Sequence, residues 1–148
     1  MNAAHLHLIS NHAPLFGLIA GLLLLAWGTL RDSHEIRIVS YVLFILSALA
    51  GGIAYLSGDA AESLVEHMPG MSEAAIERHQ DIATFALGLI VLAAVISIVA
   101  MFAERGGAAF RRGLLIGLFV VGAISVGVVG YTASLGGQIH HTEITTPQ

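Results

Sequence analysis

The stretch IATFALGLIVLAAVISIVAMF (residues 82–102) decides the fold class of this chain. It contains no Asp, Glu, Arg, Lys or His over its whole length. A helix that crosses the hydrocarbon core of a bilayer needs about 20 consecutive apolar residues. A helix that is apolar on all sides is typical of a membrane span rather than of a surface helix in a soluble domain. The stretch therefore predicts a membrane-spanning helix.

Three further stretches have the same character, at about 13–30, 38–56 and 114–135. The composition agrees, because the chain is 56 % hydrophobic and 11 % charged, whereas a soluble domain is about 25 % charged. We therefore predict an all-α protein with a single integral membrane domain over residues 1–148. Short linkers favour a four-transmembrane-helix bundle with up-down-up-down topology.

The arginines indicate how the bundle is oriented. Five of the six lie in two short linkers, 31–37 and 103–112, and the chain has no lysine. The positive-inside rule places these linkers in the cytoplasm. Both termini and the linker at 57–81 then lie outside. We expect the inner (cytoplasmic) membrane of a bacterium, with the N and C termini on the periplasmic side.

The outer linker at 57–81 is acidic and rich in helix-forming residues. Asp59 is suited to cap a helix, with Glu62 in the capping-box position three residues later. The dipeptide at 69–70 is Pro-Gly, which breaks the helix, and Ser72 is suited to start a second one. The pattern predicts two short helices on the outer surface.

Histidine gives the strongest functional signal in the sequence. On the predicted topology only His34 of the eight histidines is cytoplasmic, and the other seven gather at the outer face. They are His5, His7, His12, His67, His79, His140 and His141. Neutral imidazole is the commonest metal ligand in proteins and also ligates haem iron. The face therefore has the residues for a cofactor or metal site.

Haem is the first interpretation of this concentration. His12 and His79 lie at the outer ends of the first and third spans, which are diagonal partners in such a bundle. A bis-histidine b-type haem takes one imidazole on each side of its iron. We predict haem b bound by His12 and His79, with His67 and His141 as a second pair. The protein would transfer electrons between a quinone or membrane oxidoreductase and a periplasmic carrier such as a cytochrome.

A bare metal site is the alternative. Copper or zinc would be bound by imidazoles from the same face. The candidate metal ligands are His7, His12, His67, His79 and His141. Metal-ligating imidazoles usually donate their other N–H to a nearby acceptor. The candidate acceptors are Glu62, Glu66, Gln138 and Glu143. The third interpretation is a non-catalytic structural subunit of a membrane oligomer or larger complex.

Several function classes are disfavoured by what the sequence lacks. It has no cysteine, which excludes disulfides, thiolate metal sites and covalent haem attachment. It has no basic patch, so we expect no nucleic-acid partner. No ionisable residue lies within the predicted spans, which disfavours a proton pump or ion-coupled transporter. The sequence also has no nucleophile–base motif and no phosphate-binding loop, so nothing in it indicates a stand-alone enzyme.

Glycines are expected to mark close helix contacts and a helix end. Gly17 and Gly21 form a GxxxG pair in the first span, a spacing that favours tight packing of membrane helices. Gly136 and Gly137 follow the fourth span and are expected to end that helix.

Three segments resemble a family of bacterial four-helix membrane proteins of unknown function. They read HLHLISNHAP (5–14), SGDAAESLVEHMPGMSEAAIERHQ (57–80) and YTASLGGQIHHTEI (131–144). The resemblance implies haem or metal binding at the histidine-rich face, in company with cytochromes. The ending of the related sequences also implies that His141, rather than His140, is the ligand.

Overall fold

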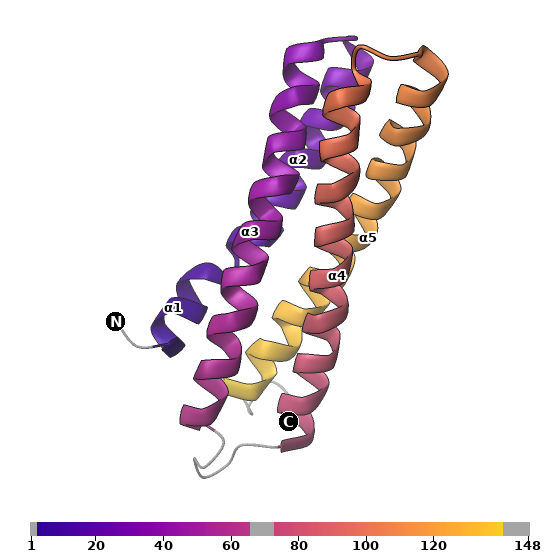
Figure 1. The fold of residues 1–148 in the computed structure, drawn as a ribbon. Coiled ribbons are helices and arrows are strands. Elements are labelled where there is room, and N and C mark those ends of the chain that lie inside the picture. The colour runs from indigo at the N-terminus through magenta and orange to yellow at the C-terminus, as the bar shows by residue number, and fades with distance from the viewer. Residues whose placement is uncertain (1–2, 66–72, 141–148) are drawn as a thin grey trace.

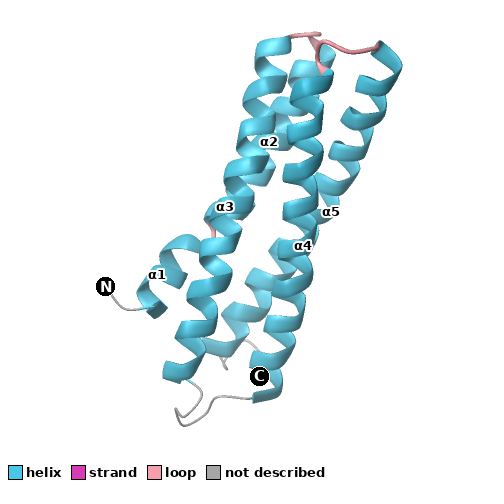
Figure 2. Cartoon of the chain, viewed as in Figure 1, coloured by secondary structure: helices cyan, strands magenta, loops and turns pink. Residues whose placement is uncertain are grey.

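The computed structural model describes residues 3–65 and 73–140, and this part of the chain is helical with no strand (Figure 2). The helices are α1 (Ala3–Ser10), α2 (Ala13–Leu30), α3 (His34–Val65), α4 (Glu73–Ala103) and α5 (Ala108–His140). The all-α prediction is therefore confirmed for the described residues. Each predicted span lies inside one of the four long helices, α2 to α5.

Four helical segments are long and apolar enough to cross a membrane. They are His5–Leu30, His34–Ala60, Glu73–Ala103 and Ala108–Gly137. Large apolar side chains such as Leu30 and Phe102 are exposed on their outer faces. In water such faces would drive aggregation, whereas in a bilayer they contact lipid. The structure is therefore compatible with a multi-pass membrane protein.

Local sequence accounts for where the helices begin and end. Pro14 lies in the first turn of α2, where its missing N–H costs no helical hydrogen bond. Asp32, between α2 and α3, has a positive φ of 47°, a conformation that Asp tolerates better than most residues. The Oγ of Ser33 then accepts a hydrogen bond from the N–H of Ile36 at 3.4 Å, as expected of an N-cap residue.

The four long helices form a ring in which each contacts two others. Helix α2 packs against α3 and α5, and α4 packs against the same two, so α2 and α4 lie on one diagonal. The connections at 31–33 and 104–107 lie together at one end of the bundle (Figure 1), which we call the arginine end. The last turns of α3 and α5 and the first turns of α4 lie at the opposite end, which we call the histidine end. The short α1 packs against α3.

The outer linker differs from the prediction. Two short surface helices are not confirmed, because residues 57–65 continue α3 and residues 73–81 begin α4. Residues 66–72 lie outside the described part of the chain. Helix α5 also continues past Gly136 and Gly137 to His140. Glycine costs a helix only about 1 kcal/mol relative to alanine, so a long helix tolerates both.

The centre of the bundle is built around Phe44, which is fully buried. A Cβ atom on Gly21 of α2 would lie 3.3 Å from its ring, and one on Gly122 of α5 would lie 2.9 Å from it. Gly17 contacts the hydroxyl group of Ser47 on α3. The GxxxG pair of α2 therefore makes the close helix contact that its spacing predicts, because glycine lets the α3 side chains approach the α2 backbone.

Candidate functional site

His7 of α1 contacts α3 near the histidine end. Its Nδ1 lies 2.8 Å from the backbone oxygen of Ala54. A carbonyl oxygen only accepts hydrogen bonds, so Nδ1 carries the proton and, in the neutral ring, Nε2 has a free lone pair. The ring lies over Gly58, where a Cβ atom would be 3.1 Å from Cε1. The contacts with α3 therefore fix both the position and the tautomer of His7.

His79 lies in the second turn of α4 and is partly buried. Its Nδ1 is buried and has no hydrogen-bond partner in residues 3–65 and 73–140. The ring packs against α5, where a Cβ atom on Gly136 would be 3.1 Å from Cε1. The backbone of Thr132 also lies within reach of the ring. A buried polar atom without a partner costs about 1–3 kcal/mol, so such an atom in a native protein often marks the place of a bound ion or water.

His7 on α1 and His79 on α4 both lie at the histidine end of the bundle, and a protonated His7 would interact electrostatically with the His79 ring. One ring is supported by α3 and the other by α5. A neutral imidazole whose second nitrogen is held by a backbone carbonyl, as in His7, is the usual form of a histidine metal ligand. The described residues include no group of three or more His, Cys, Asp or Glu that could hold a metal ion. They therefore supply a pair of imidazoles rather than a complete coordination sphere.

The other predicted ligands are placed differently. His12 is exposed at the N-cap position of α2 and makes no side-chain cap, and within the described residues no hydrogen bond or charge interaction joins it to His79. Glu62 lies in α3 and Gln138 in α5. The remaining candidates lie outside the described residues and stay predictions: His67, His141, Glu66 and Glu143.

Two side-chain hydrogen bonds join α4 to its neighbouring helices in the region of His79. The hydroxyl groups of Tyr55 on α3 and Thr84 on α4 are 3.1 Å apart. The Nη2 of Arg78 on α4 donates to the hydroxyl oxygen of Tyr131 on α5 at 2.7 Å. These contacts tie α4 to both of its neighbours at the level of His79.

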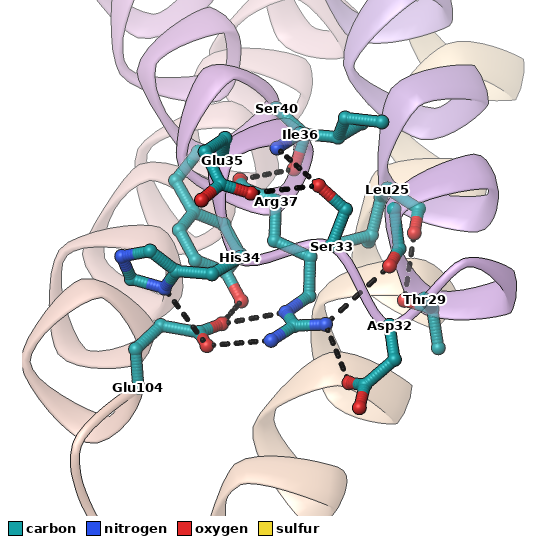
Figure 3. A network of polar contacts seen from close by, with 12 residues as sticks. Leu25, Thr29, Asp32, Ser33, His34, Glu35, Ile36, Arg37, Ser40 and Glu104 are labelled. Atoms are coloured by element: carbon teal, nitrogen blue, oxygen red, sulfur yellow. Dashed lines mark hydrogen bonds and ion pairs between the residues drawn. The ribbon is translucent and has the colours of Figure 1, made fainter.

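A second polar cluster lies at the arginine end (Figure 3). The guanidinium group of Arg37 is buried and donates to both carboxylate oxygens of Glu104, with Nε–Oε1 at 2.9 Å and Nη2–Oε2 at 2.8 Å. Such two-point pairs are the strong form of a charge-assisted hydrogen bond. Tyr41 donates to Oε1 at 2.7 Å, and His34 Nδ1 lies 3.4 Å from Oε2. Arg37 also contacts Asp32 at 3.1 Å.

This cluster joins three chain segments: the α2–α3 connection, the first turns of α3 and the end of α4. Burial favours the neutral acid form of Glu104, but the hydrogen bonds from Arg37, Tyr41 and His34 outweigh it and lower the pKa of Glu104 to about 2. The carboxylate is therefore ionised and fully engaged by donors. It is a structural connection between helices and leaves no free oxygen for a ligand.

This cluster could not be predicted from the sequence, because Arg37 and Glu104 both lie in the predicted linkers 31–37 and 103–112. A signal was present, since Arg37 and Tyr41 are four residues apart on one helix face. Glu104 directly follows the third predicted span. A charge at such a boundary that turns inward needs a partner of opposite sign, but nothing in the sequence states which one.

Comparison with known proteins gives no match. No family model, no curated protein sequence and no solved structure is detectably similar to this chain. The resemblance noted in the sequence therefore stays a prediction, and the function is argued from the geometry of the site.

Proposed function

We propose that this protein is a multi-pass membrane protein that binds a transition-metal ion, copper or zinc, through His7 and His79 at the histidine end. One observation carries the proposal: the buried Nδ1 of His79 lacks a partner among the described residues, and His7 lies within electrostatic range with its own tautomer fixed by Ala54. A metal ion would accept the lone pairs of both rings. It would remove the cost of the unpartnered nitrogen.

The chemistry of the pair favours borderline metal ions. Imidazole suits zinc, copper, iron and nickel, whereas magnesium and calcium prefer oxygen ligands. Without cysteine the chain offers no thiolate. His67 and His141 remain the predicted sources of further imidazoles, and Glu66 and Glu143 the predicted acceptors for them.

Haem b is the second candidate, and the diagonal placement of α2 and α4 supports it. In this alternative His12 and His79 are the axial ligands of a haem that exchanges electrons with a quinone or cytochrome. The exposed ring of His12 would have to turn toward the bundle. Because His79 has an electrostatic interaction with His7 rather than with His12, we place the metal ion first.

We propose that the arginine end faces the cytoplasm and the histidine end the periplasm of a bacterial inner membrane, with up-down-up-down topology. The linkers 31–37 and 103–112 hold five arginines and three carboxylates, and the rest of the chain holds one arginine and seven carboxylates. Trp27 lies near the arginine end with the Arg31 guanidinium 4.7 Å from its ring centroid. Trp and Arg at this level are typical of a membrane–water interface.

The test is a metal titration of the purified protein in detergent, combined with a reduced-minus-oxidised visible spectrum after exposure to haem. Under the metal proposal, His7→Ala and His79→Ala each weaken copper or zinc binding at least about tenfold, and His12→Ala and His34→Ala do not. Under the haem alternative, His12→Ala and His79→Ala abolish the haem spectrum and His7→Ala does not. If the protein binds neither ligand, both proposals are wrong and a structural subunit remains.

A further inference from the structure

An apolar groove runs along the outer wall of the bundle between α2 and α5. It has a volume of about 360 Å³, within the ~300–1,000 Å³ of small-molecule pockets. Its walls include Leu25, Ala26 and Leu30 of α2 and Leu115, Ile116 and Phe119 of α5. The groove therefore has the surface chemistry of a hydrocarbon-binding site.

The groove ends beside arginines. Leu30 is the last residue of α2, and the exposed Arg31 follows it directly. Arg112 precedes Ile116 by four residues on α5, so both lie on the helix face that lines the groove. Arg112 is exposed, and its side chain makes no hydrogen bond or ion pair within residues 3–65 and 73–140. Two cationic side chains thus stand at the level where a membrane helix meets water.

We propose that this groove binds an acyl chain of an anionic phospholipid from the leaflet at the arginine end, with the lipid phosphate contacting Arg112. The apolar walls match a hydrocarbon chain. Arginine near a membrane surface attracts anionic lipid headgroups. A second copy of this chain is a poorer occupant, because it would bring further arginines of the same sign to the rim. The site lies at the opposite end from His7 and His79 and does not depend on metal binding.

The test is native mass spectrometry of the full chain in detergent. Phosphatidylglycerol and phosphatidylethanolamine with identical acyl chains are titrated separately. We expect wild-type protein to bind phosphatidylglycerol at least about fivefold more tightly. Arg112→Gln reduces that binding about fivefold, because a direct contact between one arginine beside the groove and the lipid phosphate contributes about that factor. Arg105→Gln, which changes an exposed arginine in the α4–α5 connection, leaves it unchanged.

Filling the groove tests the acyl-chain site itself. Ala26→Trp, or the milder Ala26→Leu if the first variant does not fold, is expected to remove lipid binding of both kinds while helical circular dichroism is retained. Equal affinity for the two lipids, or unchanged lipid binding in a folded Ala26 variant, would overturn the proposal. A dimer that the Ala26 variants dissociate, without a change in bound lipid, would assign the groove to a second copy and also overturn it.

Discussion

The imidazole of His79 on α4 lies against Gly136 on α5, where a Cβ atom would stand 3.1 Å from Cε1 of the ring. For the next residue, Gly137, no neighbouring atom of the described residues lies within 4 Å of the position that a Cβ would take. The two adjacent glycines therefore differ in role. Gly136 makes room for a histidine ring, and Gly137 does not.

Gly136→Ala is expected to displace the His79 ring by a few tenths of an ångström. Metal–ligand distances hold to about 0.2 Å, so we expect copper or zinc affinity to fall by about tenfold. Gly137→Ala is the matched control on the same helix and should bind metal as wild type does. Equal metal affinity in the two variants would show that Gly136 does not seat a ligand.

Glu104→Gln is expected to destabilise the bundle by about 3–5 kcal/mol, because it removes the buried anionic partner of the Arg37 guanidinium and leaves the exposed Asp32 as its remaining ion-pair partner. Thermal unfolding in detergent measures the change. The control is Glu35→Gln, which changes an exposed carboxylate in the first turn of α3. Such surface changes are usually within about 0.5 kcal/mol. A Glu104→Gln variant as stable as this control would contradict the structural role of the ion pair.

Acid is expected to weaken the same ion pair. The folded-state pKa of Glu104 is lowered to about 2, from an ordinary value of 4.5. A depressed carboxylate pKa contributes stability that is fully present above the unfolded-state pKa and is lost as the pH falls through the folded-state value. We therefore expect the stability difference between wild type and Glu104→Gln to shrink as the pH falls from about 4.5 to 2. A difference that stays constant over this range would contradict the assigned ionisation.

Gly122→Ala is expected to cost about 1–3 kcal/mol of stability by overpacking. Its Cβ would stand 2.9 Å from the ring of Phe44 and 3.0 Å from Cδ2 of Leu22. In the described part of the chain, Gly117 on the same helix has no neighbouring atom within 4 Å of its Cβ position. Gly117→Ala is therefore the matched control and should be neutral or slightly stabilising. If both variants unfold at the same temperature, Phe44 does not pack as tightly as the structure indicates.

The four spans could be predicted from sequence because an uncharged apolar stretch of about 20 residues is rare outside membrane-spanning helices. His79 could also be assigned to the histidine end from the sequence, because it lies just before the span at 82–102. The position of His7 against α3 could not be predicted. It depends on a break at residues 11–12 that lets α1 pack on α3, whereas the sequence favoured His12 as the partner.

The Arg37–Glu104 ion pair could not be predicted from the sequence either. The two residues are 67 positions apart, and their contact depends on the rotation of α3 and α4 about their axes, which only the packing of both helices sets. The surface helices predicted at 57–81 were not confirmed for a local reason. The sequence there favours helix, but nothing in it separates the last turns of α3 from a new surface helix.

The most direct test of the central claim is pulsed electron paramagnetic resonance of the protein loaded with one equivalent of Cu(II), which counts the coordinated imidazoles. We expect at least two coordinated imidazoles in the wild type, one fewer in His7→Ala and one fewer in His79→Ala, with no change in His12→Ala. Spectra that do not change in His7→Ala or His79→Ala would contradict the claim that these two residues form the metal site.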